Sequence, residues 1–209
     1  MLSLPALQSR RLRELTLDAS AHPRAQPYLS AASGLVCAHG QAYVVADDEH
    51  HLAVFRDRDA PGSLHRIRSG DLPAKSKARK RRKPDLETLL LLPPPWGAGG
   101  ALLALDLGML DGVPLGFTDG AARADSSWVF CAAAEHSADS VADGACRGSV
   151  VGQVSARGDQ VAIHPLAGCA KVEGIALQPD GPSICMVTDA DDPGQCAQLL
   201  HTRLPNPRA

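Results

Sequence analysis

Residues 32–55 read ASGLVCAHGQAYVVADDEHHLAVF, and this stretch decides the fold. It contains three short apolar runs, separated by the turn His39-Gly40 and by the polar segment 47–51. Short runs rich in β-branched residues between turn signals are typical of β-strands. Three such runs joined by tight turns predict an antiparallel meander.

The same pattern returns twice in the second half of the chain. The copies begin near Gly120 and Gly174, and in every copy an acidic residue follows the leading glycine by 14 or 15 residues. A partial copy with two leucine-rich runs lies between them and the first copy. Repeated small antiparallel sheets that must stack to bury their faces are typical of β-propeller blades.

We therefore predict an all-β, β-propeller-like fold of four-stranded antiparallel blades, in a single domain covering residues 1–209. The blade-like repeats lie near residues 30–60, 84–108, 115–156 and 160–204, with a basic loop at 74–84. At about 40–45 residues per blade, the chain has room for four to five blades or for part of a longer ring.

Composition describes an ordinary globular protein, with 44% hydrophobic residues, 21% charged residues and a formal net charge of −2. No apolar stretch reaches the roughly 18 residues that span a bilayer, and the N-terminal segment lacks the apolar region of a secretion signal. We expect a cytoplasmic protein without a membrane partner. The six cysteines form no close pairs, which favours free thiols in a reducing compartment, with one or two disulfides as the alternative.

Residues 171–200, KVEGIALQPDGPSICMVTDADDPGQCAQLL, resemble the closing blade of an uncharacterised bacterial group of propellers related to phytase-like and esterase-like β-propellers. Residues 32–55, 83–94 and 130–154 resemble the same group. The resemblance implies a six-bladed ring. In this chain the first two blades run into the last two around residues 107–115, so the resemblance also implies that the middle blades are missing and the ring is incomplete.

Acidic residues follow or precede the strands at corresponding points of the repeats. Because the first strand of a propeller blade lines the central channel, these side chains could converge on a hard cation such as Ca²⁺, which prefers carboxylate oxygens. The predicted metal ligands are Glu173, Asp119, Asp189, Asp191 and Asp48. The alternative is that each carboxylate accepts backbone hydrogen bonds in a turn or at the start of a strand.

Three further side chains are predicted to contact a ligand: one that precedes a leading glycine as Asp119 and Glu173 do, one that lies beside Glu173, and one acid that follows the second strand of a repeat. They are Lys171, Ser33 and Glu135. The basic loop supplies a different candidate, a polyanion contact formed by Arg79, Lys80, Arg81 and Arg82. A solvated loop extended by self-repulsion is the alternative. No aromatic residue interleaves these charges to stack on bases, so we expect no nucleic-acid partner.

The sequence lacks a G-x-S-x-G elbow and a P-loop, and no catalytic residue can be assigned. We predict a binding or scaffold module that takes a small ligand or a protein partner. The alternative is a metal-assisted, calcium-type hydrolase, such as a phosphoesterase or esterase, that uses the acids at the propeller axis. Whether the protein is an enzyme stays open at this stage.

Overall fold

The computed structural model describes residues 4–56, 59–82, 107–136, 145–158, 160–168 and 170–205. These residues form three antiparallel sheets and one short helix, so the prediction of an all-β chain is confirmed. Most of the repeat predicted at residues 84–108 lies outside the described residues. No described helix is long and apolar enough to cross a membrane.

The first sheet contains four strands in sequential order. They are β2 (Ala32–Ala38), β3 (Gln41–Ala46), β4 (His51–Phe55) and β5 (Ser63–Arg66). His39 and Gly40 both have positive φ in the turn between β2 and β3, as two-residue hairpin turns that match the strand twist require. The helix α1 (Ser76–Lys80) follows this sheet and begins within the predicted basic loop.

The second sheet has five strands in the order β10-β9-β8-β7-β6. They are β6 (Met109–Leu110), β7 (Val113–Ala122), β8 (Trp128–His136), β9 (Ala145–Val154) and β10 (Gln160–Pro165). Strand β10 pairs with β9, so residues 160–165 belong to this sheet and not to the final repeat, in which the sequence analysis placed them.

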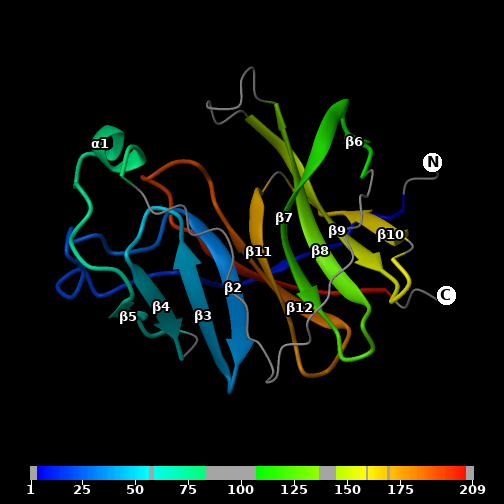
Figure 1. Cartoon of the computed structure of the whole chain (residues 1–209), viewed down its shortest axis with the longest axis horizontal. Helices are drawn as coiled ribbons and strands as arrows, with labels where there is room; N and C mark the ends of the chain where they lie inside the picture. The colour runs from blue at the N-terminus through cyan, green and yellow to red at the C-terminus, as the bar shows by residue number, and fades with distance from the viewer. Residues whose placement is uncertain are drawn as a thin grey trace.

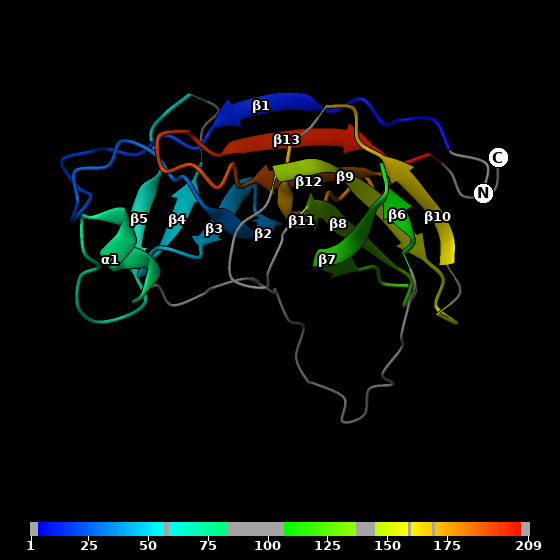
Figure 2. The ribbon, with the colours of Figure 1, turned by 90° about the horizontal axis from the view of Figure 1, so that it is seen from above.

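The third sheet combines the two ends of the chain, in the order β1-β13-β12-β11. Its strands are β1 (Arg10–Glu14), β11 (Val172–Leu177), β12 (Ser183–Thr188) and β13 (Gln198–Arg203). The N-terminal strand β1 is therefore the outer strand of the last sheet, a pairing that closes the fold across the whole length of the chain (Figure 2).

The three sheets lie side by side, with the third between the other two (Figure 1). Its first strand β11 contacts β2 on one side and both β7 and β8 on the other. As a result the third sheet is buried on both faces, and every residue of β12 is buried. One apolar cluster fills the space toward the first sheet and includes Leu35, Val44 and Val187. A second fills the space toward the second sheet.

That second cluster contains Val129, Val151, Ile175 and Met186, all buried almost completely. A third apolar cluster, around Phe130, covers the opposite face of the second sheet. Burial of both faces explains why the third sheet has no alternation of apolar and polar residues, as is usual for a sheet enclosed between two layers.

Strands β2, β7 and β11, one from each sheet, share an irregularity that supports the repetition of the sheets. The pairing register shifts once in each, between Ala32 and Gly34, between Phe117 and Asp119, and between Val172 and Gly174. The residue skipped by the shift is Ser33, Thr118 or Glu173. Ser33 and Glu173 are thus at equivalent positions, as predicted, whereas the equivalent residue of the second sheet is Thr118, one residue before Asp119.

Candidate functional site

Four charged side chains meet where β11 begins. Lys171 lies in the segment just before β11, and its Nζ is 2.7 Å from Glu135 Oε1, 3.2 Å from Glu173 Oε1 and 3.0 Å from Asp191 Oδ2. Glu135 comes from β8 of the second sheet, Glu173 from β11 and Asp191 from the loop between β12 and β13. We call these four residues the acidic cluster.

The acidic cluster is half-sheltered from solvent. The Lys171 and Glu173 side chains are 13% and 12% exposed, and those of Asp191 and Glu135 are 23% and 32% exposed. Burial disfavours the charged ammonium, but the nearby Glu173, Glu135 and Asp191 carboxylates outweigh it and raise the pKa of Lys171. The lysine therefore stays charged at all physiological pH values.

A cavity of about 380 Å³ adjoins the acidic cluster. The residues that line it come from the start of β11, the end of β12, the loop after it and the start of β9; they include Lys171, Thr188, Asp189, Asp191, Cys146, Cys196 and Gln198. Burial raises the pKa of both thiols, that of Cys196 to about 11, so both are neutral near pH 7.

Asp189 is the most unusual titratable group of this cavity. It is 7% exposed, and burial, together with the charges of Asp191 and Asp47, raises its pKa to about 7 although the Asp191 backbone N–H and the Lys171 charge act in the opposite direction. Its Oδ1 accepts a hydrogen bond of 2.7 Å from that N–H. A carboxyl that titrates near neutral pH inside a cavity is a feature of functional sites.

Local turn chemistry fixes the loop that carries Asp191. Asp191 has a positive φ of 52°, a conformation that Asp tolerates better than most residues. Asp192 accepts hydrogen bonds from the Gly194 backbone N–H, 2.8 Å, and from the Gln195 side chain, 3.0 Å. Asp192 is thus a turn residue, and the loop presents Asp191 to Lys171.

The structure brings together four of the eight residues predicted as metal ligands or ligand contacts. These four form the acidic cluster, and a fifth, Asp189, lines the adjoining cavity. The other three lie elsewhere. Ser33 is buried in β2. Asp119 lies in β7, where it is buried against β11. Asp48 pairs with Arg79 at an Oδ2 to Nε distance of 2.7 Å.

The five predicted metal ligands therefore do not converge on one ion. Within the described part of the chain, no group of three or more His, Cys, Asp or Glu side chains is arranged to hold a metal. At the acidic cluster, the position between the carboxylates is filled by the Lys171 ammonium. The five predicted ligands are therefore too dispersed to bind one calcium ion together.

The residues of the predicted polyanion contact differ in their exposure to solvent. Arg79 is 5% exposed and donates hydrogen bonds to Asp48 and to the backbone oxygens of Pro73 and Ala74, at 3.3 and 2.9 Å. Its charge is therefore neutralised inside the fold, and the prediction is wrong for this residue. Arg81 and Arg82 are exposed, and the side chain of Lys80 lies outside the described residues.

A buried charged network near β4 was missed by the sequence analysis. Glu49, 1% exposed, accepts hydrogen bonds from His22 Nε2, at 3.0 Å, and from both terminal nitrogens of Arg24. His51 Nδ1 lies 3.6 Å from its other oxygen. The segment 47–51 reads as a polar turn. The one sequence signal of a partner for it is that residues 19–31 contain a single histidine and a single arginine among neutral residues.

Two family models match overlapping parts of the chain. Residues 28–105 match a family of unknown function, DUF6929, and residues 98–193 match another family of unknown function, DUF6910. No curated protein matches the chain. The acidic cluster and Asp189 fall within the second match, so the chain is similar, over the part that carries its candidate site, to DUF6910 proteins.

Proposed function

We propose that this protein is a binding module whose ligand is a small organic cation, or the cationic end of a larger partner, held at the acidic cluster and the adjoining cavity. One observation carries the proposal. The Lys171 ammonium is surrounded by three carboxylates, from two sheets and one loop, and Lys171 and Asp191 also line a cavity of about 380 Å³.

The net charge of the acidic cluster indicates the sign of the charge that its ligand should carry. Three carboxylates and one ammonium leave two negative charges, and ionised Asp189 adds a third near neutral pH. The Lys171 Nζ donates hydrogen bonds to both Asp191 oxygens, at 3.2 and 3.0 Å, and lies within ion-pair distance of Glu135 and Glu173. Lys171 therefore holds the three carboxylates together but offsets only one of their charges, and the remaining negative charge favours a cationic ligand over a neutral or anionic one.

A ligand-dependent melting experiment tests this proposal. Putrescine, agmatine and arginine are the cationic probes, with succinate and 1,4-butanediol as anionic and neutral comparators. We expect the cations alone to raise the unfolding temperature at millimolar concentration, and the effect to weaken as ionic strength increases. Asp191→Asn should reduce the shift at least several-fold, whereas Glu14→Gln, which alters an exposed carboxylate on β1, should leave it unchanged. Equal shifts with all probes would rule the proposal out.

Asp189 gives a specific reason to keep a second candidate, a hydrolase in which this carboxyl acts as general acid or base. A group with a pKa of about 7 is matched to proton transfer at neutral pH. A panel of phosphate and carboxylic esters, assayed with and without Ca²⁺, tests it. Turnover that Asp189→Asn abolishes would favour the hydrolase, and absence of turnover across the panel would remove it.

We also propose that the three sheets are blades of a propeller-type ring that is incomplete. Three features support this. The sheets have four, five and four strands in meander order, β11 lies beside both β2 and β7, and the N-terminal strand completes the last sheet. Kinship with phytase-like and esterase-like propellers is part of the same proposal. A crystal structure in which one constant rotation fails to superpose the three sheets would contradict it.

A further inference from the structure

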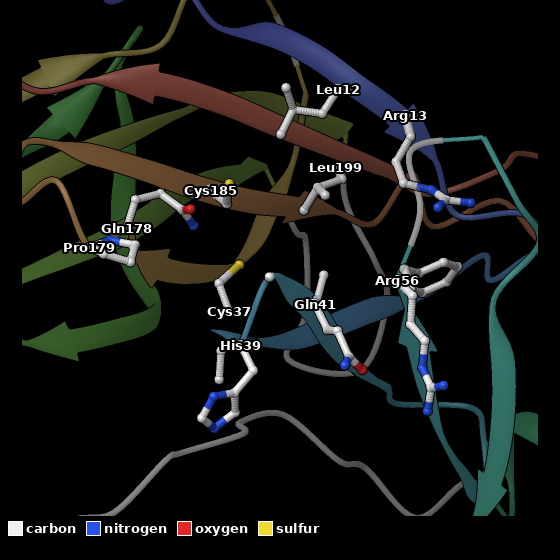
Figure 3. A pocket seen from close by; sticks show the side chains of 14 residues that line it. Leu12, Arg13, Cys37, His39, Gln41, Arg56, Gln178, Pro179, Cys185 and Leu199 are labelled. Atoms are coloured by element: carbon white, nitrogen blue, oxygen red, sulfur yellow. The ribbon is translucent and has the colours of Figure 1, made fainter.

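A second cavity, of about 420 Å³, lies between the first and third sheets at the end of β11 opposite to Lys171. It is lined by the turn between β2 and β3, by Gln178 and Pro179 after β11, and by side chains from β12 and β13. Two cysteines reach it from different sheets, Cys37 from β2 and Cys185 from β12 (Figure 3).

The two thiols are in contact. The Cys37 side chain extends from β2 toward the strand that carries Cys185 (Figure 3). Cys37 packs against the apolar cluster that contains Cys185, and a side-chain hydrogen bond links the two thiols. Cys37 is half-buried at the cavity, while Cys185 is 4% exposed behind it. An oxidant entering the cavity therefore meets Cys37 first, with Cys185 already beside it.

The hydrogen bond makes the pair chemically unequal. Donation from Cys185, assisted by the Gln178 side chain, lowers the pKa of Cys37 despite burial. The same interaction and burial raise the pKa of Cys185. Among the cysteines that the structure describes, Cys37 alone has a lowered pKa, because burial raises that of Cys131, Cys146 and Cys196.

We propose that Cys37 and Cys185 form a reversible disulfide when the protein meets a hydroperoxide, and that Cys37 is the residue attacked first. The thiolate, not the thiol, is the nucleophile in such chemistry, and a neighbouring thiol that resolves the first product is typical of redox-sensitive cysteines. The inference uses neither the acidic cluster nor the function proposed above.

The reaction balances in two steps. The Cys37 thiolate attacks one oxygen of the hydroperoxide, the O–O bond breaks, and the other oxygen leaves as an alcohol, or as water for hydrogen peroxide, after taking up the Cys37 proton. Cys37 becomes a sulfenic acid. The Cys185 sulfur then attacks the Cys37 sulfur, the S–O bond breaks, and water leaves with the Cys185 proton. The two thiols lose two electrons, and the peroxide bond gains them.

The product would tie β2 of the first sheet to β12 of the third. The first sheet holds residues 32–66, and the third holds strands from both ends of the described chain, so that Cys37 and Cys185 lie 148 positions apart (185 − 37). A covalent link across such a long stretch of sequence restricts the unfolded chain. Oxidation is therefore expected to stabilise the packing of the first sheet against the third.

The experiment treats the reduced, full-length protein with hydrogen peroxide, blocks residual thiols by alkylation and maps the peptides without reduction. We expect a Cys37–Cys185 linked peptide as the main product, and a rise of about 5 °C in the unfolding temperature that dithiothreitol reverses. Cys185→Ala should instead leave a Cys37 sulfenic acid that dimedone traps. Cys196→Ala, the matched control at the other cavity, should give the wild-type result.

The wild-type peptide map decides the question even if Cys185→Ala does not fold. Cys37 and Cys185 both remaining open to alkylation while other cysteines oxidise would overturn the proposal. A disulfide between Cys37 and any other cysteine, within the chain or between chains, would overturn it as well.

Discussion

The Asp119 carboxylate accepts a hydrogen bond of 2.9 Å from the Ile175 backbone N–H, and so links the second sheet to the third. Its other oxygen accepts from the Gly120 backbone N–H at 2.8 Å. One residue earlier, Thr118 Oγ1 donates to the Val172 backbone oxygen at 2.8 Å. Two polar side chains of β7 thus pair with backbone groups of β11, and these bonds set the register of one sheet against the next.

Replacing Asp119 by alanine should destabilise the protein, because it leaves the Ile175 N–H buried without an acceptor. A buried unsatisfied donor costs about 1–3 kcal/mol, and urea unfolding followed by circular dichroism measures the loss. Asp119→Asn keeps an acceptor and should cost less. Asp192→Ala, which alters an exposed turn, should leave the unfolding midpoint almost unchanged. Equal midpoints for Asp119→Ala and Asp192→Ala would contradict this role.

The raised pKa values of two buried carboxyls lead us to expect that the free energy of unfolding decreases as the pH rises from 4 to 7. Burial raises the pKa of Asp119 to about 6 and that of Asp189 to about 7, from 3.8. The folded state therefore holds these protons more tightly than the unfolded state, and the stabilisation is lost as the pH passes through the folded pKa values. His51 has a pKa lowered by burial and acts in the opposite direction below pH 6.5.

Comparison with variants isolates the two carboxyls from His51. The free energy of unfolding is measured from pH 4.5 to 7.5. It should decrease less with rising pH in Asp189→Asn than in the wild type. In Asp119→Asn the difference should be confined to the range below about pH 6. Parallel curves for all three proteins would show that neither carboxyl has a raised pKa.

The buried Glu49 network should be far more sensitive to mutation than a surface ion pair. Burial raises the pKa of Glu49, but the hydrogen bond from His22 and the Arg24 charge outweigh it and keep the pKa lowered. Glu49→Gln should cost about 3 kcal/mol, because it removes the nearer counter-charge of buried Arg24 and leaves only the Asp48 carboxylate, 3.9 Å away. Glu14→Gln breaks the exposed pair with Arg11 and should cost less than about 1 kcal/mol. Chemical denaturation of both variants gives the comparison.

The sequence was sufficient to predict the central strands of the three sheets, because β2–β4, β7–β9 and β11–β13 are each built from neighbours in the chain. The turns at His39-Gly40 and around Gly181, both with positive φ, and the periodic glycines are local signals. The outer strand β1 is not local. It pairs with β13, which lies near the other end of the chain, and nothing in the charged stretch Arg10–Glu14 specifies that partner.

The acidic cluster was predicted in part for the same reason. Lys171, Glu173 and Asp191 belong to one repeat, and their positions relative to its strands follow from the hairpin pattern. Asp119 and Asp48 were assigned by analogy between repeats, and a shift of one residue at the bulge is enough to point a carboxylate into the interior. The burial of Arg79 could not be predicted, since it depends on α1 folding back onto the turn that carries Asp48.

The basic loop contains one arginine that is buried, Arg79, and one that is exposed to solvent, Arg82. Mutation should affect stability only at the buried one. Arg79→Ala removes the 2.7 Å bond to Asp48 and two bonds to backbone oxygens. We expect it to lower the free energy of unfolding by about 2–3 kcal/mol. Arg82→Ala alters an exposed side chain and should change it by no more than about 0.5 kcal/mol. Similar losses in both would mean that Arg79 is not buried.

Gly174 marks the closest approach of the third sheet to the first, and a methyl group there should separate them. A Cβ at Gly174 would lie 2.7 Å from Val187 Cγ2 and 3.1 Å from both the Leu35 nitrogen and the Ser33 oxygen. Since two of these atoms are backbone, they cannot move aside without moving β2, and overpacking of this kind costs about 1–3 kcal/mol. Gly116→Ala is the matched control, because a Cβ at Gly116, in β7, would meet nothing within 4 Å. Denaturation midpoints should fall for Gly174→Ala alone; if both variants unfold like the wild type, β11 and β2 do not pack as closely as the fold requires.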